Sequence, residues 1–237
     1  MYPEKQKLPQ NVTRRRSTKA EQRAEMTEQI LDAAEDLFSK HGLHGVTLQD
    51  VAKRVRVHHT LLNYYFKDKK KLFDEVFARR ALISSSRRMN ALDKYEKACK
   101  GKPTVEGALR TFLDCDLDLY IEGGEGWRNY AQLGAQVANT PEWGAQLMDK
   151  HFDPVVLRLI DLLKKALPEI SLTEIFWSYH FATGSLMHTL ARTGRIDKLS
   201  GGRCKSDDFL AVKERMADFM AGGFRAVCKK SKKKTKR

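Results

Sequence analysis

Apolar residues recur at helical spacing along most of the chain. From Thr27, the apolar positions 30, 31, 34, 37 and 38 lie on one helical face, and Gly42 ends that helix. Thr47 begins a second helix, because TLQD places an acid three residues after a capping threonine. The short run HHTLLNYYF is compatible with a third helix, and Asp68 is a suitable N-cap for a longer fourth helix.

The rest of the chain has the same periodicity. Helical patterns cover residues 104–121, 152–167 (ended by Pro168) and 209–220, and Ser171-Leu-Thr-Glu174 begins a further helix as a capping box. Thr140-Pro141-Glu142 is a typical helix start, whereas residues 194–206 contain two adjacent glycines and are expected to form a loop. Since no stretch alternates with period two, the sequence predicts an all-α fold.

The net charge of +14 is unevenly distributed along the 237 residues. Residues 1–80 hold 17 Lys and Arg against 11 Asp and Glu, residues 81–228 are nearly neutral, and residues 229–237 hold seven basic residues and no acid. This pattern indicates a basic module attached to a neutral body. We therefore expect a flexible basic arm (1–26), a basic helical module (27–72), a helical body (73–228) and a disordered lysine-rich tail (229–237).

The composition also limits where the protein works. No apolar run is long enough to span a bilayer, and the N-terminus lacks the apolar stretch of a secretory signal. The four cysteines are far apart and form no CxxC pair, which suits reduced thiols better than disulfides or a zinc site. We expect a cytoplasmic protein without a membrane partner.

The basic module has the features of a helix-turn-helix: three short helices, a tight connection before the third, and cations on both sides of it. These residues resemble the tetracycline-repressor (TetR) family of regulators. The resemblance covers residues 27–76, in particular Gly45-Val-Thr47-Leu-Gln-Asp-Val-Ala-Lys-Arg and Tyr65-Phe66. It implies a three-helix DNA-binding domain followed by a larger helical domain for ligand binding and dimerisation.

The resemblance also assigns roles to individual residues. Thr47 and Gln49 would contact the DNA backbone, and Tyr65 and Lys69 would each contact a phosphate, while Leu62 and Phe66 would be core. The residues expected to face the groove are His58, His59, Thr60, Asn63 and Tyr64. The sequence departs from the family pattern at Arg56, where glycine is common, and at His58, Leu61 and Asn63. An Asn amide can pair with the N6/N7 edge of adenine, so Asn63 is a candidate base reader.

Metal and phosphate sites are disfavoured. His58 and His59 are adjacent, so their rings diverge on a helix, and no third ligand lies nearby in the sequence. The acids between Asp114 and Glu125 lack the glycine that a calcium loop requires, and the glycines at 123–126 lack a GK[ST] ending. We expect no metal, no cofactor and no enzymatic activity.

The neutral body has aromatic residues and methionines that could line a pocket for an apolar molecule. Core packing is the alternative for each of them. The segment 126–143 is similar to the branch of the family that senses fatty acids or acyl thioesters, and the family implies a homodimer formed by the last two long helices. The candidate ligand-binding residues are Trp127, Tyr130, Phe152, Trp177, His180, Phe181 and Met187.

The leading hypothesis is therefore a homodimeric repressor that releases a double-stranded, pseudo-palindromic operator when an apolar effector binds. Two alternatives remain open at this point: a sequence-blind DNA-binding protein driven by the lysine tail, and an all-α small-molecule-binding protein or enzyme with an incidental basic N-terminus.

Overall fold

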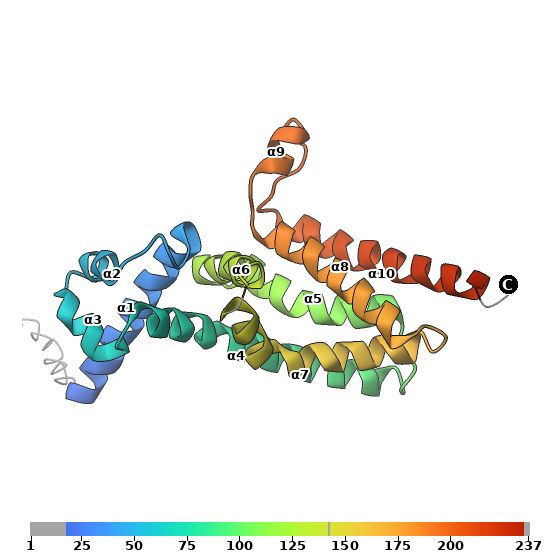
Figure 1. Cartoon of the computed structure of the whole chain (residues 1–237), viewed down its shortest axis with the longest axis horizontal. Coiled ribbons are helices and arrows are strands. Elements are labelled where there is room, and N and C mark those ends of the chain that lie inside the picture. Colours follow the sequence, from blue (N-terminus) through green and yellow to red (C-terminus); the bar gives the residue numbers. More distant parts are fainter. Residues whose placement is uncertain (1–17, 142, 235–237) are drawn as a thin grey trace, which may run out of the picture.

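A computed structural model describes residues 18–141 and 143–234, with the backbone alone for residues 228–234. The described residues form ten helices and no strand, which confirms the all-α prediction. The helices lie in two regions, with α1–α3 and the start of α4 at one end and the remaining helices packed as a body (Figure 1). Their bounds are α1 Lys19–His41, α2 Leu48–Val55, α3 His59–Phe66, α4 Lys69–Ala98, α5 Val105–Glu122, α6 Glu125–Ala138, α7 Trp143–Ala166, α8 Leu172–Leu190, α9 Arg195–Leu199 and α10 Phe209–Lys234.

The first helix begins earlier than predicted. Thr18 caps it, and Glu21 completes the capping box by accepting a hydrogen bond from the Thr18 backbone, so residues 19–26 are helix and not part of an arm. The T-x-x-E signal was present in the sequence but stood in a polar stretch without apolar periodicity. The remainder of the predicted arm, residues 1–17 with Arg14–Arg16, lies outside the described residues.

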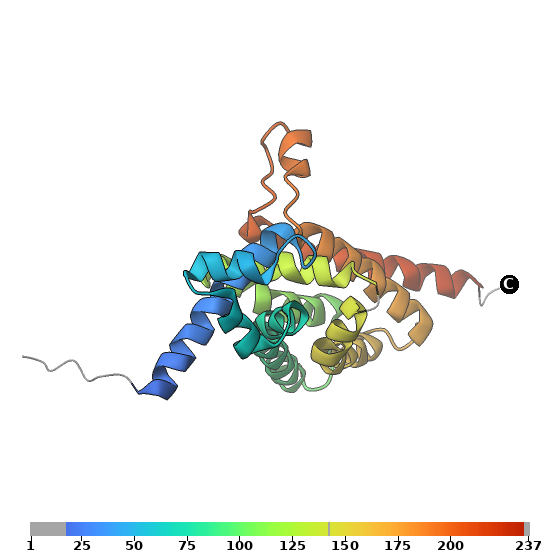
Figure 2. The same ribbon diagram turned by 60° about the vertical axis from the view of Figure 1, so that its left-hand side comes forward.

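Of the later boundaries, one agrees with prediction and two differ. Helix α7 begins at Trp143, directly after the predicted helix start at 140–142, and runs through Pro154, whose ring removes one donor without ending the helix. Residues 195–199 of the predicted loop form the short helix α9, which stands away from the body (Figures 1 and 2). Helix α10 continues to Lys234, into the segment expected to be disordered; lysine is a good helix former, so the packed helix extends. Residues 235–237 lie outside the described residues.

The core is one continuous apolar cluster that joins both regions. Ile30, Phe38 and Leu62 are buried between the N-terminal helices, and Phe73 and Phe77 continue the cluster along α4 into the body. Helix α4 packs against α1 on one side and against α5 and α7 on the other. The position of α1–α3 relative to the body is therefore set by the 30-residue helix α4 and by the packing of α1 against α6.

Candidate nucleic-acid interface and internal cavity

The turn between α2 and α3 sets the direction of the third helix. The Thr47 hydroxyl accepts from the Asp50 backbone, and the Asp50 carboxylate accepts from the Thr47 backbone, so the predicted capping box begins α2. Arg56 ends α2 in the left-handed conformation (φ 58°, ψ 43°). A residue with a Cβ adopts this conformation at a cost that glycine avoids. The turn therefore keeps the geometry expected of glycine despite the substitution.

His58 has a structural role in addition to its predicted one. It is the N-cap residue of α3, where its Nδ1 accepts from the Thr60 backbone and lies 2.7 Å from the Thr60 hydroxyl. The ring of His58 also packs against that of His59, with centroids 4.5 Å apart. Histidine thus replaces the small capping residue of the family pattern by supplying a ring nitrogen in place of a hydroxyl.

Helix α3 has one buried face and one exposed face. Leu62 and Phe66 are fully buried, as predicted for core residues one turn apart. The opposite face is exposed and includes the candidate groove residues His59, Thr60, Asn63 and Tyr64, with Gln49 exposed at the start of α2. Tyr64 is the most exposed of these aromatic residues, with 70% of its surface open.

Arg23 is a residue of this surface that the sequence did not reveal. Its guanidinium lies 5.4 Å from the Tyr64 ring centroid and 5.3 Å from that of Tyr65. This places a cation from α1 between the two tyrosines, of which Tyr65 is the more buried. The signal was missed because residues 19–26 were treated as an arm, and no spacing rule relates position 23 to position 64.

The cations around α3 differ in whether they are already paired. Arg54 pairs with Asp36 at 3.1 Å, and Lys70 and Lys71 pair with acids one turn along α4. By contrast, Lys53, Arg56, Lys67 and Lys69 have no acid within 4 Å among the described residues. Lys69 is the first residue of α4, where the Asp68 side chain caps the helix.

An internal cavity of about 50 Å³ lies between α4, α5, α6, α7 and α8. Three candidate ligand residues line it: Tyr130, Phe152 and Met187. Its wall is largely aromatic and aliphatic, and Gly134 contributes to it from α6. The volume is sufficient for a few water molecules or a small organic fragment, and the flexible Met148 and Met187 side chains allow it to adapt.

A buried ion pair forms the polar part of the cavity wall. Arg88 Nη2 lies 2.8 Å from Asp116 Oδ2, and the same oxygen accepts from the hydroxyls of Ser84 at 2.7 Å and Tyr120 at 3.2 Å. Burial lowers the pKa of Arg88, but Asp116 and the nearby tyrosines Tyr120, Tyr130 and Tyr179 together offset this and raise the pKa, so the guanidinium stays charged. Burial, with Asp116 beside it, holds the pKa of Tyr120 well above its usual range.

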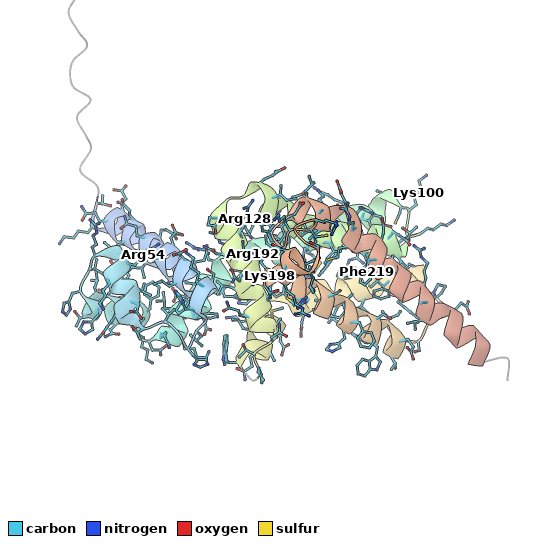
Figure 3. All side chains as sticks on the ribbon, turned by 90° about the horizontal axis from the view of Figure 1, so that it is seen from above. Arg54, Lys100, Arg128, Arg192, Lys198 and Phe219 are labelled. Carbon is cyan, nitrogen blue, oxygen red and sulfur yellow. The ribbon has the colours of Figure 1, made fainter. Side chains whose placement is uncertain are left out.

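The other candidate ligand residues lie elsewhere. Trp127 is buried outside the cavity wall, with the Arg80 guanidinium 5.0 Å from its ring. Trp177, His180 and Phe181 lie on the exposed face of α8, with Phe181 65% exposed. The sequence offered only a ligand pocket or the core for these aromatic residues, because their spacing does not show which face of α8 is turned inward. Phe219 on α10 is another exposed apolar residue, far from the Arg54 end of the molecule (Figure 3).

An ion-pair network connects the N-terminal helices to the body. Glu35 of α1 is buried and accepts from Arg79 Nη2 at 2.9 Å and from Arg80 Nε at 2.6 Å and Nη2 at 2.9 Å. Burial lowers the pKa of Arg79, but Glu35 and then Asp32 reverse this effect and raise it. Gly126 of α6 lies so close that an added Cβ would be 2.0 Å from Arg80 Nη2. A side chain at position 126 would therefore have to displace the Arg80 guanidinium from its place beside Glu35.

Two family models match the chain. The model of bacterial regulatory proteins of the tetR family matches residues 30–76, and the tetracycline repressor-like C-terminal domain matches residues 110–223. Together these matches cover more than half of the chain. The first match ends within α4, and the second begins within α5.

Individual relatives agree with these models. A biofilm operon negative transcriptional regulator, IcaR of Staphylococcus aureus (strain Newman), is 40% identical over 50 residues, which are 21% of this chain and 27% of that regulator. A mutant of HlyIIR has a similar fold (TM-score 0.55, 19% identity), covering 83% of this chain and 95% of that one. FadR of Bacillus subtilis, solved in complex with stearoyl-CoA, has a TM-score of 0.51 at 15% identity, covering 83% and 98%.

Within residues 18–141 and 143–227, no group of three or more His, Cys, Asp or Glu side chains is arranged to hold a metal ion. None of the described helices combines the length and the apolarity that crossing a membrane requires.

Proposed function

The chain belongs to the tetracycline-repressor family of transcriptional regulators, and on that premise we propose that it is a repressor that releases its operator when an apolar small molecule binds the body. The observation that carries the proposal is that α3 has one buried face and one exposed face. Its buried face anchors the helix, and its exposed face presents His59, Thr60 and Asn63 near cations of which several form no ion pair within 4 Å.

In the proposed complex, α3 lies in the major groove. His59, Thr60, Asn63 and Tyr64 reach base edges, and Asn63 pairs with an adenine. Thr47, Gln49, Tyr65 and Lys69 contact the DNA backbone, which contributes affinity and orientation but no sequence preference. The carboxylate of Asp50 already accepts from the Thr47 hydroxyl. Thr47 can therefore contact a phosphate only if this hydrogen bond is exchanged, so its contribution should be smaller than that of Lys69.

We propose that two copies associate through α8 and α10. The exposed aromatic residues Trp177 and Phe181 on α8 and Phe219 on α10 form an apolar surface of a kind that isolated soluble proteins seldom leave uncovered. Small residues at 182, 184 and 185 permit close helix approach. A two-fold dimer places two α3 helices in successive major grooves, about 34–36 Å apart.

The effector would bind in the cavity between α4 and α8 and favour a conformation with the wrong separation of the two α3 helices. Tyr130, Phe152 and Met187 are the residues proposed to contact it. The cavity is far smaller than the roughly 300–1,000 Å³ of typical ligand sites, so an acyl chain would have to displace side chains. The fatty acid or acyl thioester suggested by the sequence remains a prediction.

One experiment tests the proposal and separates it from the two alternatives. The full-length protein is used to select duplexes from a random-sequence pool at two salt concentrations, and the selected duplexes are sequenced. Recovery of a pseudo-palindrome supports the regulator. Salt-sensitive binding without sequence enrichment would indicate a sequence-blind binder, and absence of binding would favour a small-molecule-binding protein or enzyme.

A further inference from the structure

The cavity contains two buried polar atoms of opposite hydrogen-bonding character. Arg88 Nε, a donor, and Asp116 Oδ1, an acceptor, are both inaccessible to solvent and have no hydrogen-bond partner among the described residues. Both residues line the cavity, and they are joined through Arg88 Nη2 and Asp116 Oδ2. A buried polar atom without a partner is unfavourable, so a molecule that satisfies both atoms gains affinity from each.

The crowding at Asp116 explains why one oxygen is left over. Arg88, Ser84 and Tyr120 all approach Oδ2, so the carboxylate is held by one oxygen while the other remains available. The Arg88 guanidinium lies 4.3 Å from the centroid of the Phe112 ring, which also lines the cavity. An unpartnered donor and an unpartnered acceptor therefore belong to two residues of an otherwise apolar wall, and a small movement of the neighbouring side chains is needed to expose them.

We propose that this cavity binds a small, neutral, apolar molecule that carries one group able both to donate and to accept a hydrogen bond, such as an alcohol or a primary amide. The group accepts from Arg88 Nε and donates to Asp116 Oδ1, and the hydrocarbon part contacts the aromatic wall and Met187. A carboxylate is disfavoured because it brings a second negative charge beside Asp116. A ketone or thioester is disfavoured because it offers no donor to Oδ1.

The size of the cavity agrees with this class. About 50 Å³ accommodates a polar group and a few carbon atoms, and a larger ligand needs the methionines to move. Identifying such a molecule as the effector rests on the proposed function, whereas its binding to the cavity does not.

The test uses four six-carbon probes that differ in their polar group: 1-hexanol, hexanamide, 2-hexanone and hexanoate. Dissociation constants are measured on the full-length protein by ligand-observed NMR titration at pH 7. We expect 1-hexanol and hexanamide to bind at least tenfold more tightly than 2-hexanone and hexanoate, a ratio equivalent to about 1.4 kcal/mol. Equal or tighter binding of 2-hexanone or hexanoate overturns the proposal, as does no binding by any probe, which would mean that the cavity holds only water.

Two variants locate the site. Asp116→Asn replaces the acceptor with a group that can donate, so the preference for 1-hexanol over 2-hexanone should be lost. Gly134→Leu adds a large side chain at a residue of the cavity wall that does not take part in the ion pair, and an added Cβ there has no atom within 4 Å. It should abolish binding of all four probes, and unchanged 1-hexanol binding by this variant would rule out the cavity. If Asp116→Asn does not fold, the four probes on the wild-type protein and on Gly134→Leu still test the proposal.

A parallel measurement separates this inference from the proposed function. DNA affinity is followed by fluorescence anisotropy on a duplex recovered from the selection, with and without each probe. If 1-hexanol binds with the expected preference but leaves DNA affinity unchanged, the cavity assignment stands and the proposed ligand response fails. If hexanoate alone binds and releases DNA, the proposed function stands and the cavity assignment fails.

Discussion

Replacing Glu35 with Gln should weaken the connection between the DNA-binding helices and the body. Glu35 is 2% exposed and accepts three hydrogen bonds, one from Arg79 and two from Arg80. Gln keeps the size of the side chain but removes the charge and one acceptor oxygen. The two guanidinium groups then lose the anion that they share.

The expected loss of unfolding free energy in Glu35→Gln follows from the number and kind of hydrogen bonds that Glu35 accepts. Hydrogen bonds to charged groups contribute about 1.5–3 kcal/mol, and neutral ones contribute about 0.5–1.5 kcal/mol. Replacing three hydrogen bonds to a carboxylate by neutral ones therefore costs roughly 3 kcal/mol. The Arg79 and Arg80 side chains are 19% and 17% exposed, so water replaces part of this interaction. We therefore expect the unfolding free energy to fall by about 2 kcal/mol, given that breaking a fully buried pair costs about 3–5 kcal/mol.

Glu28 provides a matched control because it pairs with the same arginine. Its contact with Arg79 Nη1 is 3.0 Å, but its side chain is 62% exposed, so Glu28→Gln should cost roughly 0–1 kcal/mol. Urea denaturation of both variants and the wild type, at pH 7 and one fixed protein concentration, measures the two effects. Equal losses in the two variants would show that burial of Glu35 does not strengthen the junction, and the reasoning would be refuted.

Three further predictions concern single residues. Lys69→Ala should weaken binding to all duplexes alike and reduce the salt slope by about one, whereas Asn63→Ala should change which duplexes are selected; the reverse result would place α3 wrongly in the groove. Arg56→Gly should raise the unfolding free energy by roughly 0.5–1 kcal/mol by relieving the left-handed strain, and Arg56→Ala, which keeps the strain but also loses the charge, should not. Burial lowers the pKa of His151 below its ordinary 6.5, so the unfolded chain gains a proton at a higher pH than the folded chain does. Stability measured by thermal melting should therefore fall between about pH 7 and pH 5, and His151→Leu should show a smaller fall; an identical pH profile would contradict this.

Local signals in the sequence predicted much of the N-terminal domain. The caps at Thr47 and Asp68 and the Gly42 stop depend on neighbouring residues only, and all three occur in the structure as predicted. The cap at Thr18 was also a local signal, but the residues after it are polar on all sides, so nothing marked them as a packed helix. Periodicity detects helices that bury a face and misses those that do not.

The contacts between distant segments could not be predicted in the same way. Arg23 approaches Tyr64 and Tyr65, and Arg88 pairs with Asp116, only because separate helices pack side by side. The two halves of each contact carry no pattern that relates them along the chain. For the same reason, sequence spacing could not predict which aromatic residues of the body line the cavity and which are exposed. Tyr130 lies in the cavity wall, whereas Phe181 lies on the exposed surface.

Helix α4 connects the cavity wall to the end of α3, so a small rotation at one end would displace the other end by a distance that its length sets. Its 30 residues span about 45 Å, and Arg88 in the cavity wall lies 19 residues, or about 28 Å, from Lys69 at the end next to α3. A rotation of α4 by about 6° around Arg88 would therefore displace the Lys69 end by roughly 3 Å, close to the length of one hydrogen bond. A side-chain rearrangement in the cavity of about 50 Å³ that turned α4 by this angle would therefore be amplified along the arm to a displacement of one hydrogen-bond length at Lys69.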